Sequence, residues 1–198
     1  MTAQEVLDFW FLPEGSEGYG TLRDVWFKKD AAFDAVIVER FGALIGQAVA
    51  GGLREWDAQG PRGSVARILV LDQFTRNAWR GQPASFAGDA LALAAARALV
   101  DSGAERSLPP LMRWFVYMPF EHAEDAAMQA RSVELFAALA AQHAGQPLHE
   151  GLAGALDYAH RHRGVIARFG RFPHRNAILG RASSAEEIDF LKQPGSSF

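Results

Sequence analysis

Helical periodicity of the apolar residues constrains the fold of this chain more than any other feature of its sequence. After Asp30 the apolar side chains fall on one side of a helix: Phe33, Ile37, Phe41, Leu44, Ile45 and Ala48. No segment alternates apolar and β-branched residues with polar ones in the way that predicts a strand. The sequence therefore predicts an all-α fold with roughly seven or eight helices.

Two capping boxes predict where the first and last helices begin. Thr2 is followed by Glu5, and Ser184 by Glu187. At this spacing each side chain accepts a hydrogen bond from the other residue's backbone amide at a helix start. We therefore expect helices from about residue 2 to 12 and from about residue 184 to 190.

Glycine and proline predict the boundaries of the inner helices. Residues 60–63 break the periodic pattern, and Ser64 is expected to cap a helix that ends near Asp72. Pro119 is expected to be the first residue of a helix that runs to about His143. Because the breaks are short, we expect antiparallel helix pairs stacked in a single domain over residues 1–198.

Composition excludes several classes of function. The chain has 198 residues, a net charge of −3 and no cysteine. A weakly acidic protein has no overall attraction to nucleic acid or to an anionic membrane, and a chain without thiols has neither disulfides nor a cysteine nucleophile. No basic segment precedes a signal-like apolar run, and no uninterrupted run of about 18 apolar residues occurs. The sequence predicts a cytoplasmic protein with no nucleic-acid or membrane partner.

Positive charge gathers near the C-terminal end of the chain. No acidic residue occurs between Asp157 and Glu186, whereas this segment contains Arg161, Arg163, Arg168, Arg171, Arg175, Arg181, His160, His162 and His174. Guanidinium groups bind carboxylates and phosphates with two parallel hydrogen bonds. Either acidic side chains from elsewhere in the chain or an anion from solution must therefore neutralise the segment.

The segment around Asp72 is one source of acidic partners. Asp72 and Arg76 are four residues apart, which suits an ion pair on one helix, and Asn77 adds hydrogen-bonding groups. Polar residues also satisfy the open backbone groups at a helix end, so a structural role and a functional role both stay open.

The segment Glu121–Asp125 is the other source. Its acids are expected in the opening turn of the helix that follows Pro119, where negative charge is favoured. His122 is not explained in this way, because a cationic imidazole at a helix start needs a facing carboxylate or ligand. A neutral capping histidine is the alternative.

Other chemistries receive little support. Glu121, His122, His162 and His174 could bind a divalent metal, but no His-Glu-x-x-His motif occurs and the neighbouring arginines would repel a cation. The chain also lacks a phosphate loop, a dinucleotide fingerprint and a Gly-x-Ser-x-Gly motif. The sequence predicts no metal and no cofactor.

At these three segments the chain resembles a bacterial family catalogued as domain of unknown function nine-two-four. The similarity covers residues 6–11, Trp26-Phe27, the helix after Asp30, residues 71–77, residues 118–122 and residues 169–181, with Thr75 at a position where the family has proline. It implies an all-helical, TPR-like fold and points to His162, more than His160, as a member of the polar centre. The family has no assigned activity that could be carried over.

Three hypotheses follow for the polar centre. The first is a binding module in which an anionic small molecule or acidic peptide contacts Arg168, Arg171, His174, Arg175 and Asn176. The second is an enzyme with His122 or His162 as general acid or base, oriented by Asp72 or Glu121. The third is an ionic clamp that ties helix ends together. Nothing in the sequence separates a monomer from a dimer.

Overall fold

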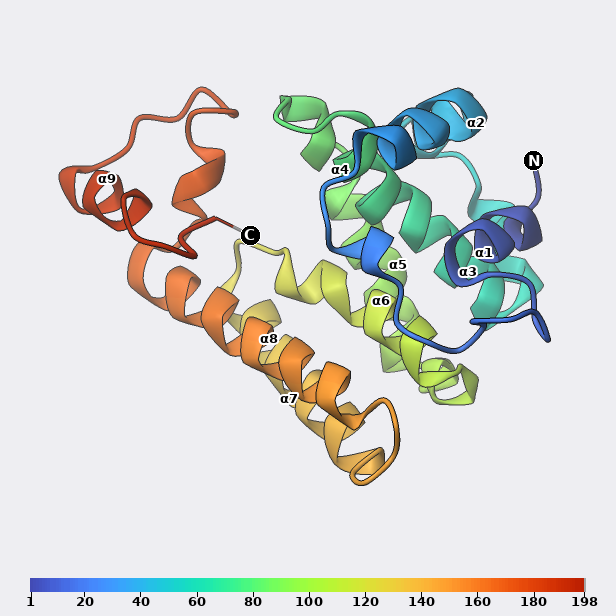
Figure 1. Cartoon of the computed structure of the whole chain (residues 1–198). Coiled ribbons are helices and arrows are strands. Elements are labelled where there is room, and N and C mark those ends of the chain that lie inside the picture. Colours follow the sequence, from blue (N-terminus) through green and yellow to red (C-terminus); the bar gives the residue numbers. More distant parts are fainter. Residues whose placement is uncertain (198) are drawn as a thin grey trace.

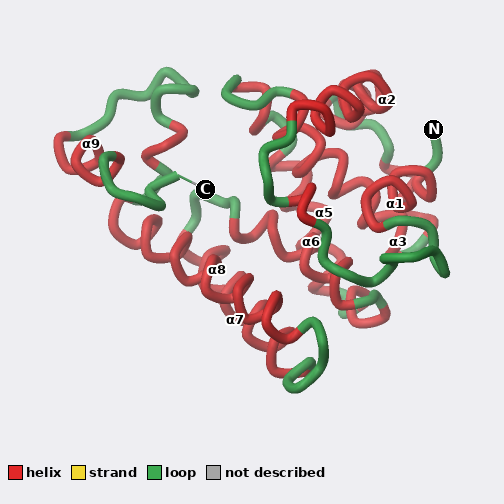
Figure 2. Tube along the Cα trace, viewed as in Figure 1, coloured by secondary structure: helices red, strands yellow, loops and turns green. Residues whose placement is uncertain are grey.

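Helices and loops make up residues 1–197, which are the residues that this computed structural model describes, and no strand occurs among them (Figure 2). The all-α prediction is confirmed. The α-helices are α1 (Ala3–Phe11), α2 (Ala31–Val49), α3 (Pro61–Ile68), α4 (Thr75–Ala78), α5 (Asp89–Asp101), α6 (Pro110–Glu121), α7 (Ala126–Gln142), α8 (His149–Phe169) and α9 (Ala185–Leu191).

Both predicted capping boxes are confirmed. The Thr2 side chain accepts a hydrogen bond from the Glu5 amide, the Ser184 side chain accepts one from the Glu187 amide, and both glutamates bond back to the cap residue. These contacts join residues three apart, so the local sequence alone is enough to specify them.

The helix that carries Asp72 differs from its predicted bounds at both ends. Gly60 caps it with a positive φ of 94° and Pro61 is its first residue, so Ser64 lies inside the helix and caps nothing. At Leu69 the backbone changes to a π-helical segment, η3 (Leu69–Phe74), and then continues directly into α4. Asp72 therefore lies in the middle of a continuous helical rod, at the kind of π insertion that is frequent in functional sites.

The prediction for Pro119 is wrong. Pro119 lies inside α6, which ends at Glu121, and α7 begins only after Asp125. The Asp125 carboxylate accepts hydrogen bonds from the Ala127 and Met128 amides at 2.8 and 2.9 Å, and so caps the helix that was expected to begin at Pro119. Of the three acids expected in one opening turn, only Asp125 lies at the start of α7.

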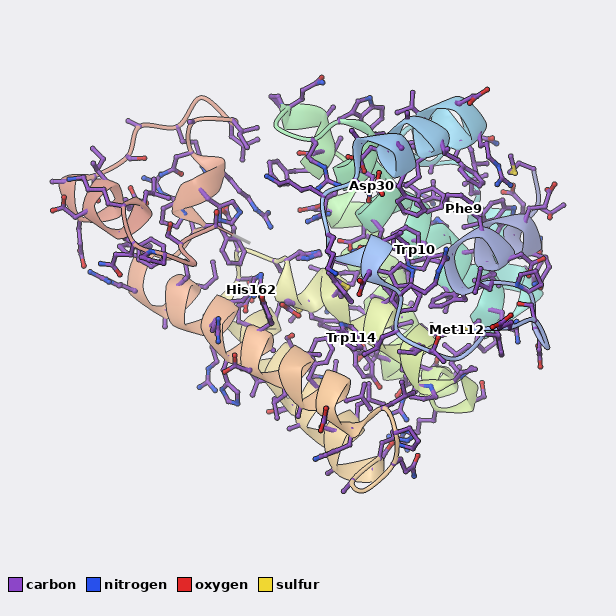
Figure 3. The ribbon with its side chains drawn as sticks, viewed as in Figure 1. Phe9, Trp10, Asp30, Met112, Trp114 and His162 are labelled. Carbon is purple, nitrogen blue, oxygen red and sulfur yellow. The ribbon has the colours of Figure 1, made fainter. Side chains whose placement is uncertain are left out.

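Helix α6 lies at the centre of the packing and contacts α3, α5, α7 and α8 (Figure 1). Helices α7 and α8 lie side by side and are antiparallel, whereas α1 packs on α3 and α2 packs on η3 and α4. One buried apolar cluster includes side chains from Ala3 to Ala159, and Phe9 and Trp10 of α1 contribute aromatic rings to it (Figure 3). The antiparallel pair is consistent with stacked helix pairs, while TPR-like stacking itself stays a prediction.

One stretch, Pro83–Asp101, is long and apolar enough to cross a membrane by length and composition alone. It comprises a short 3-10 segment, η4 (Pro83–Phe86), and α5, and only 39% of its apolar window is buried inside the protein. Helix α5 packs on α3 and α6, and its first residue, Asp89, forms ion pairs with two arginines. A core helix of a soluble protein passes the same test.

Gly88 allows α5 to begin in close contact with η3. A Cβ atom at this position would lie 2.0 Å from the backbone oxygen of Leu71, within the π-helical segment. The missing side chain therefore brings the first turn of α5, and Asp89 with it, against the helix that carries Asp72.

We expect Gly88→Ala to destabilise the protein by about 3 kcal/mol, because the obstructing atom belongs to buried backbone that cannot rotate away. Gly154→Ala is the matched control, since no atom lies within 4 Å of a Cβ there and the position is inside α8. It should stabilise by about 0.5 to 1 kcal/mol. Urea unfolding measures both changes, and equal effects would contradict this account of the contact.

Candidate functional site

A buried carboxylate, Asp72, lies at the centre of the candidate site. Its side chain is 1% exposed. Oδ1 accepts hydrogen bonds from His122 Nδ1 at 2.7 Å and from Arg76 Nη1 at 3.1 Å, and Oδ2 accepts one from Gln73 Nε2 at 2.6 Å. Burial would raise the pKa of Asp72, but the charge of Arg76 and the hydrogen bonds from His122 and Gln73 outweigh it and hold the pKa well below its usual range. Asp72 is therefore a carboxylate at neutral pH.

His122 is a neutral imidazole with a fixed orientation. It caps the C-terminal end of α6, not the start of a helix as the sequence analysis expected. Burial and the charge of Arg76 lower its pKa, although Asp72 acts in the opposite direction. Because the Asp72 carboxylate only accepts hydrogen bonds, Nδ1 of His122 carries the proton and Nε2 keeps its lone pair. Nε2 makes no hydrogen bond within the described part of the chain.

His122 lines an open cleft of about 550 Å³. One wall comes from η4 and the first two turns of α5, and the other comes from the residues between α6 and α7. The described residues that line it are Pro83, Phe86, Ala87, Asp89, Ala90, Leu93, Pro119, His122, Ala123, Glu124, Asp125, Arg175 and Leu179. The cleft thus lies where two of the three predicted segments meet α5.

Asp89 connects the middle of the chain to the arginine-rich segment. Its carboxylate accepts hydrogen bonds from Arg76 Nη1 and Nη2 at 2.9 and 3.1 Å, and from Arg175 Nη1 at 3.2 Å. Sequence reasoning missed Asp89, because an acid in the first turn of an alanine-rich helix is explained by the helix dipole alone.

Arg175 is held in a buried position at the wall of the cleft. Its guanidinium Cζ lies 4.6 Å from the ring centroids of both Phe86 and Phe172, and Nη2 donates to the His122 carbonyl at 3.1 Å. Burial and the charge of Arg76 lower the pKa of Arg175 to about 10, so it remains a cation at neutral pH. Arg175 therefore binds the C-terminal segment to the end of α6.

Glu124 and Arg181 form a second link between these segments. The guanidinium of Arg181 donates to both carboxylate oxygens of Glu124 at 2.6 and 2.8 Å, and the Phe172 amide donates to Oε1 at 2.8 Å. Burial alone would raise the pKa of Glu124, but the hydrogen bonds from Arg181 and Phe172 lower it. The expectation that acids from the middle of the chain neutralise the C-terminal cations is met here by Glu124.

His162 belongs to a separate buried pair. It lies on α8 facing the end of α6 (Figure 3), and its Nδ1 is 2.9 Å from Glu121 Oε1 and 2.9 Å from the Tyr158 carbonyl. Both side chains of the His162–Glu121 pair are 6% exposed. The imidazole centroids of His122 and His162 are 6.3 Å apart, but His162 does not line the cleft. Of the two histidine candidates, only His122 reaches the cleft.

The structure leaves several predicted site residues outside the cleft. Asn77 donates to Asp34 on α2, and Asn176 contacts Ser183 and Arg181. Arg168 and Arg171 pair with Glu186 and Glu187 of the closing helix α9 instead of acids from the middle of the chain. The capping role of Glu187 was predicted, and its second role as partner of Arg171 was not.

His174 lies on η6 (Pro173–Arg175), next in sequence to Arg175 of the cleft wall, and its ring centroid is 5.6 Å from that of Phe172. Burial, Arg175 and His162 lower its pKa to about 4. Within residues 1–197, no group of three histidine or carboxylate side chains is placed to hold a metal ion.

Comparisons with known proteins reveal a similar chain of known structure. A family model described as a bacterial protein of unknown function (DUF924) matches residues 6–195. The solved structure of ATU0120, a protein of unknown function from Agrobacterium tumefaciens, is 37% identical in sequence, with a TM-score of 0.80 over 96% of each chain. No curated protein matches the chain.

Arg175→Ala should destabilise the protein by about 3 kcal/mol, because it removes a buried side chain stacked between two rings together with its hydrogen bonds. Arg168→Ala is the control: its side chain is 48% exposed, so the loss should stay below about 1 kcal/mol. Thermal and urea unfolding measure both. Equal losses of unfolding free energy in the two variants would show that burial does not determine how much Arg175 contributes to stability.

The lowered pKa of His174 makes stability depend on pH. The pKa of this histidine is lower in the folded state than its value of about 6.5 in the unfolded state. As the pH falls, the unfolded state therefore takes up a proton first, which favours unfolding. Stability should therefore fall by roughly 2 to 3 kcal/mol from this group as pH drops from about 6.5 to 4. His174→Gln should flatten the curve of unfolding free energy against pH in this window. His160→Gln, at an exposed position, should leave the curve unchanged.

Proposed function

Because this chain belongs to the DUF924 family of bacterial proteins, whose description assigns no activity, we propose a function from the site itself: the cleft binds a small molecule and His122 acts on it as a general base. One observation carries the proposal. The Asp72 carboxylate aligns the neutral imidazole of His122, and His122 lines an open cleft. A base of this kind needs the proton-accepting form near neutral pH, and a pKa below the usual value for histidine provides it.

The lining of the cleft narrows the reaction class. No serine, threonine, tyrosine or lysine is among the described residues that line it. The group that His122 deprotonates is therefore a water molecule or the ligand itself. In that step a proton moves from oxygen, nitrogen or carbon to Nε2, while Nδ1 keeps its own proton and its hydrogen bond to Asp72. The negative charge of Asp72 then stabilises the imidazolium that forms.

Binding of an anionic small molecule or acidic peptide stays a prediction, and the ion pairs weigh against it. The arginines proposed to hold the anion, Arg168, Arg171 and Arg175, each pair with a carboxylate of this chain. An anion would have to displace one of these carboxylates, at the cost of leaving it unpaired. The ionic-clamp hypothesis describes the same contacts and is compatible with a base at His122.

Cytoplasmic residence and TPR-like stacking also belong to the proposal. The absence of cysteine supports the first, and the antiparallel pair of α7 and α8 supports the second. Neither bears on the role of His122.

The test combines a pH titration with a search for turnover. Nitrogen NMR of labelled histidine should show His122 as the Nδ1-protonated tautomer with a pKa below 6.5, and Asp72→Asn should lower that pKa further by removing the facing charge. Chromogenic esters, amides and phosphoesters then serve as probes of hydrolysis. Any turnover should fall by about 10²- to 10⁴-fold in His122→Gln, and should decline with falling pH as the imidazole is protonated.

His160→Gln is the control for this experiment, because it removes an exposed histidine that lies outside the cleft. If His122→Gln keeps full turnover, and turnover falls only in variants that unfold, then His122 is not a general base. The ionic-clamp hypothesis would then be the remaining account of the site.

A further inference from the structure

A second hollow lies farther along α5 than the cleft beside His122. The α5 residues Ala90 and Leu93 line the cleft, and Arg97 and Asp101 line a further hollow of about 330 Å³. At this spacing they lie along one face of the helix. The opposite wall continues in the same order, from Asp125 at the cleft to residues 127–134 of α7.

Helix α6 contributes one lining residue to each hollow. Pro119 lines the first hollow and Phe120 lines the second, and α6 packs against both α5 and α7. The two hollows share no lining residue, but residues from the same segments line both in the same order, so we treat them together as one groove between α5 and α7, the α5–α7 groove.

Ionisable side chains follow a definite order along this groove. Asp89, Glu124 and Asp125 lie at the end near His122 together with Arg175, whereas Arg97 and Arg131 lie beyond it, one on each wall. Leu93, Phe120 and Met128 provide apolar surface between the two groups.

The two arginines of the groove are the least neutralised cations in it. Arg97 makes no ion pair within residues 1–197, and the single partner of Arg131 is Glu134 at 3.8 Å. By contrast, Arg175 at the other end pairs with Asp89. The carboxylates of Asp101 and Glu134, one turn beyond the arginines, also line the far hollow. From the His122 end the groove thus presents carboxylates, an apolar stretch, guanidinium groups and a second set of carboxylates. Of the first set, Asp89 and Glu124 are paired with arginines, whereas Asp125 makes no ion pair within residues 1–197.

The separation of the two charged ends sets the size of a ligand. Asp89 and Arg97 are eight residues apart on α5, which corresponds to about 12 Å at 1.5 Å per residue. An extended peptide covers roughly 3.3 to 3.6 Å per residue, so three or four residues span this distance.

We propose that the α5–α7 groove binds a short free peptide of about three to four residues, with its amino end toward Asp125 and its carboxylate between Arg97 and Arg131. The charge order fixes the direction, and the apolar middle takes the side chains. A peptide bound in this direction places its amino-terminal residues beside His122. This inference rests on the proposed function in that it names the class of ligand for the same site.

Isothermal titration calorimetry with the tetrapeptide Ala-Leu-Leu-Ala tests the inference. The free peptide should bind saturably at millimolar or lower concentration. Its N-acetyl form and its C-terminal amide should each bind about fivefold more weakly, because each lacks one charged end. The combined Arg97→Gln and Arg131→Gln substitutions should weaken binding of the free peptide about fivefold and leave binding of the amide unchanged.

Arg163→Gln is the matched control, because it removes an exposed arginine of α8 that lies outside both hollows. All three positions are exposed, so the variants should fold, which circular dichroism confirms. Absence of saturable binding, or equal affinity for the free peptide and its amide, would overturn the inference. Equal affinity for an ω-amino fatty acid of matched length would overturn the assignment to peptides.

The outcome for His122 is separable from the outcome for the peptide. His122→Gln should keep most of the peptide affinity, because no ligand charge depends on it. Peptide binding without any His122-dependent turnover would refute the proposal that His122 is a general base and would leave the peptide-binding proposal standing. Turnover of another probe that depends on His122, without peptide binding, would remove the α5–α7 groove proposal alone.

Discussion

Burial of the Asp72 charge is the constraint on which the rest of the site depends. A carboxylate that is 1% exposed persists only if hydrogen bonds and opposite charge replace the water it has lost. Gln73 and Arg76 supply part of this from the same helical rod, and His122 supplies the rest from the end of α6. One buried charge therefore fixes α6 against the rod and fixes the tautomer of His122.

The same charge is connected to the C-terminal segment through a chain of alternating partners. Arg76 contacts both Asp72 and Asp89, and Asp89 contacts Arg175, which in turn donates to the carbonyl of His122. Gly88 is part of this arrangement, because its lack of a Cβ lets α5 approach η3 and places Asp89 within reach of both arginines. The cleft lies at the edge of this network, so its charged groups are held in position before any ligand binds.

Much of the fold could be predicted because it depends on local spacing. Helix α2 and the two capping boxes follow from residues three or four apart, and these predictions are confirmed. The prediction for Pro119 failed because proline is favoured at a helix start, while packing of α6 in the core tolerates it near the helix end. The π-helical turn at Asp72 was not predictable, since contacts with α2, α5 and α6 surround it.

The sequence by itself determined the helical class, the helix starts with local caps, and the presence of cations that need acidic partners. Only the tertiary structure decided which acids these are: Glu124 for Arg181, Asp89 for Arg175, and Glu186 and Glu187 for Arg168 and Arg171. It also decided that His122 lines the cleft and His162 does not. The physical reason is that caps join neighbouring residues, whereas these four ion pairs join residues 16 to 86 positions apart, and their geometry is set by how whole helices pack.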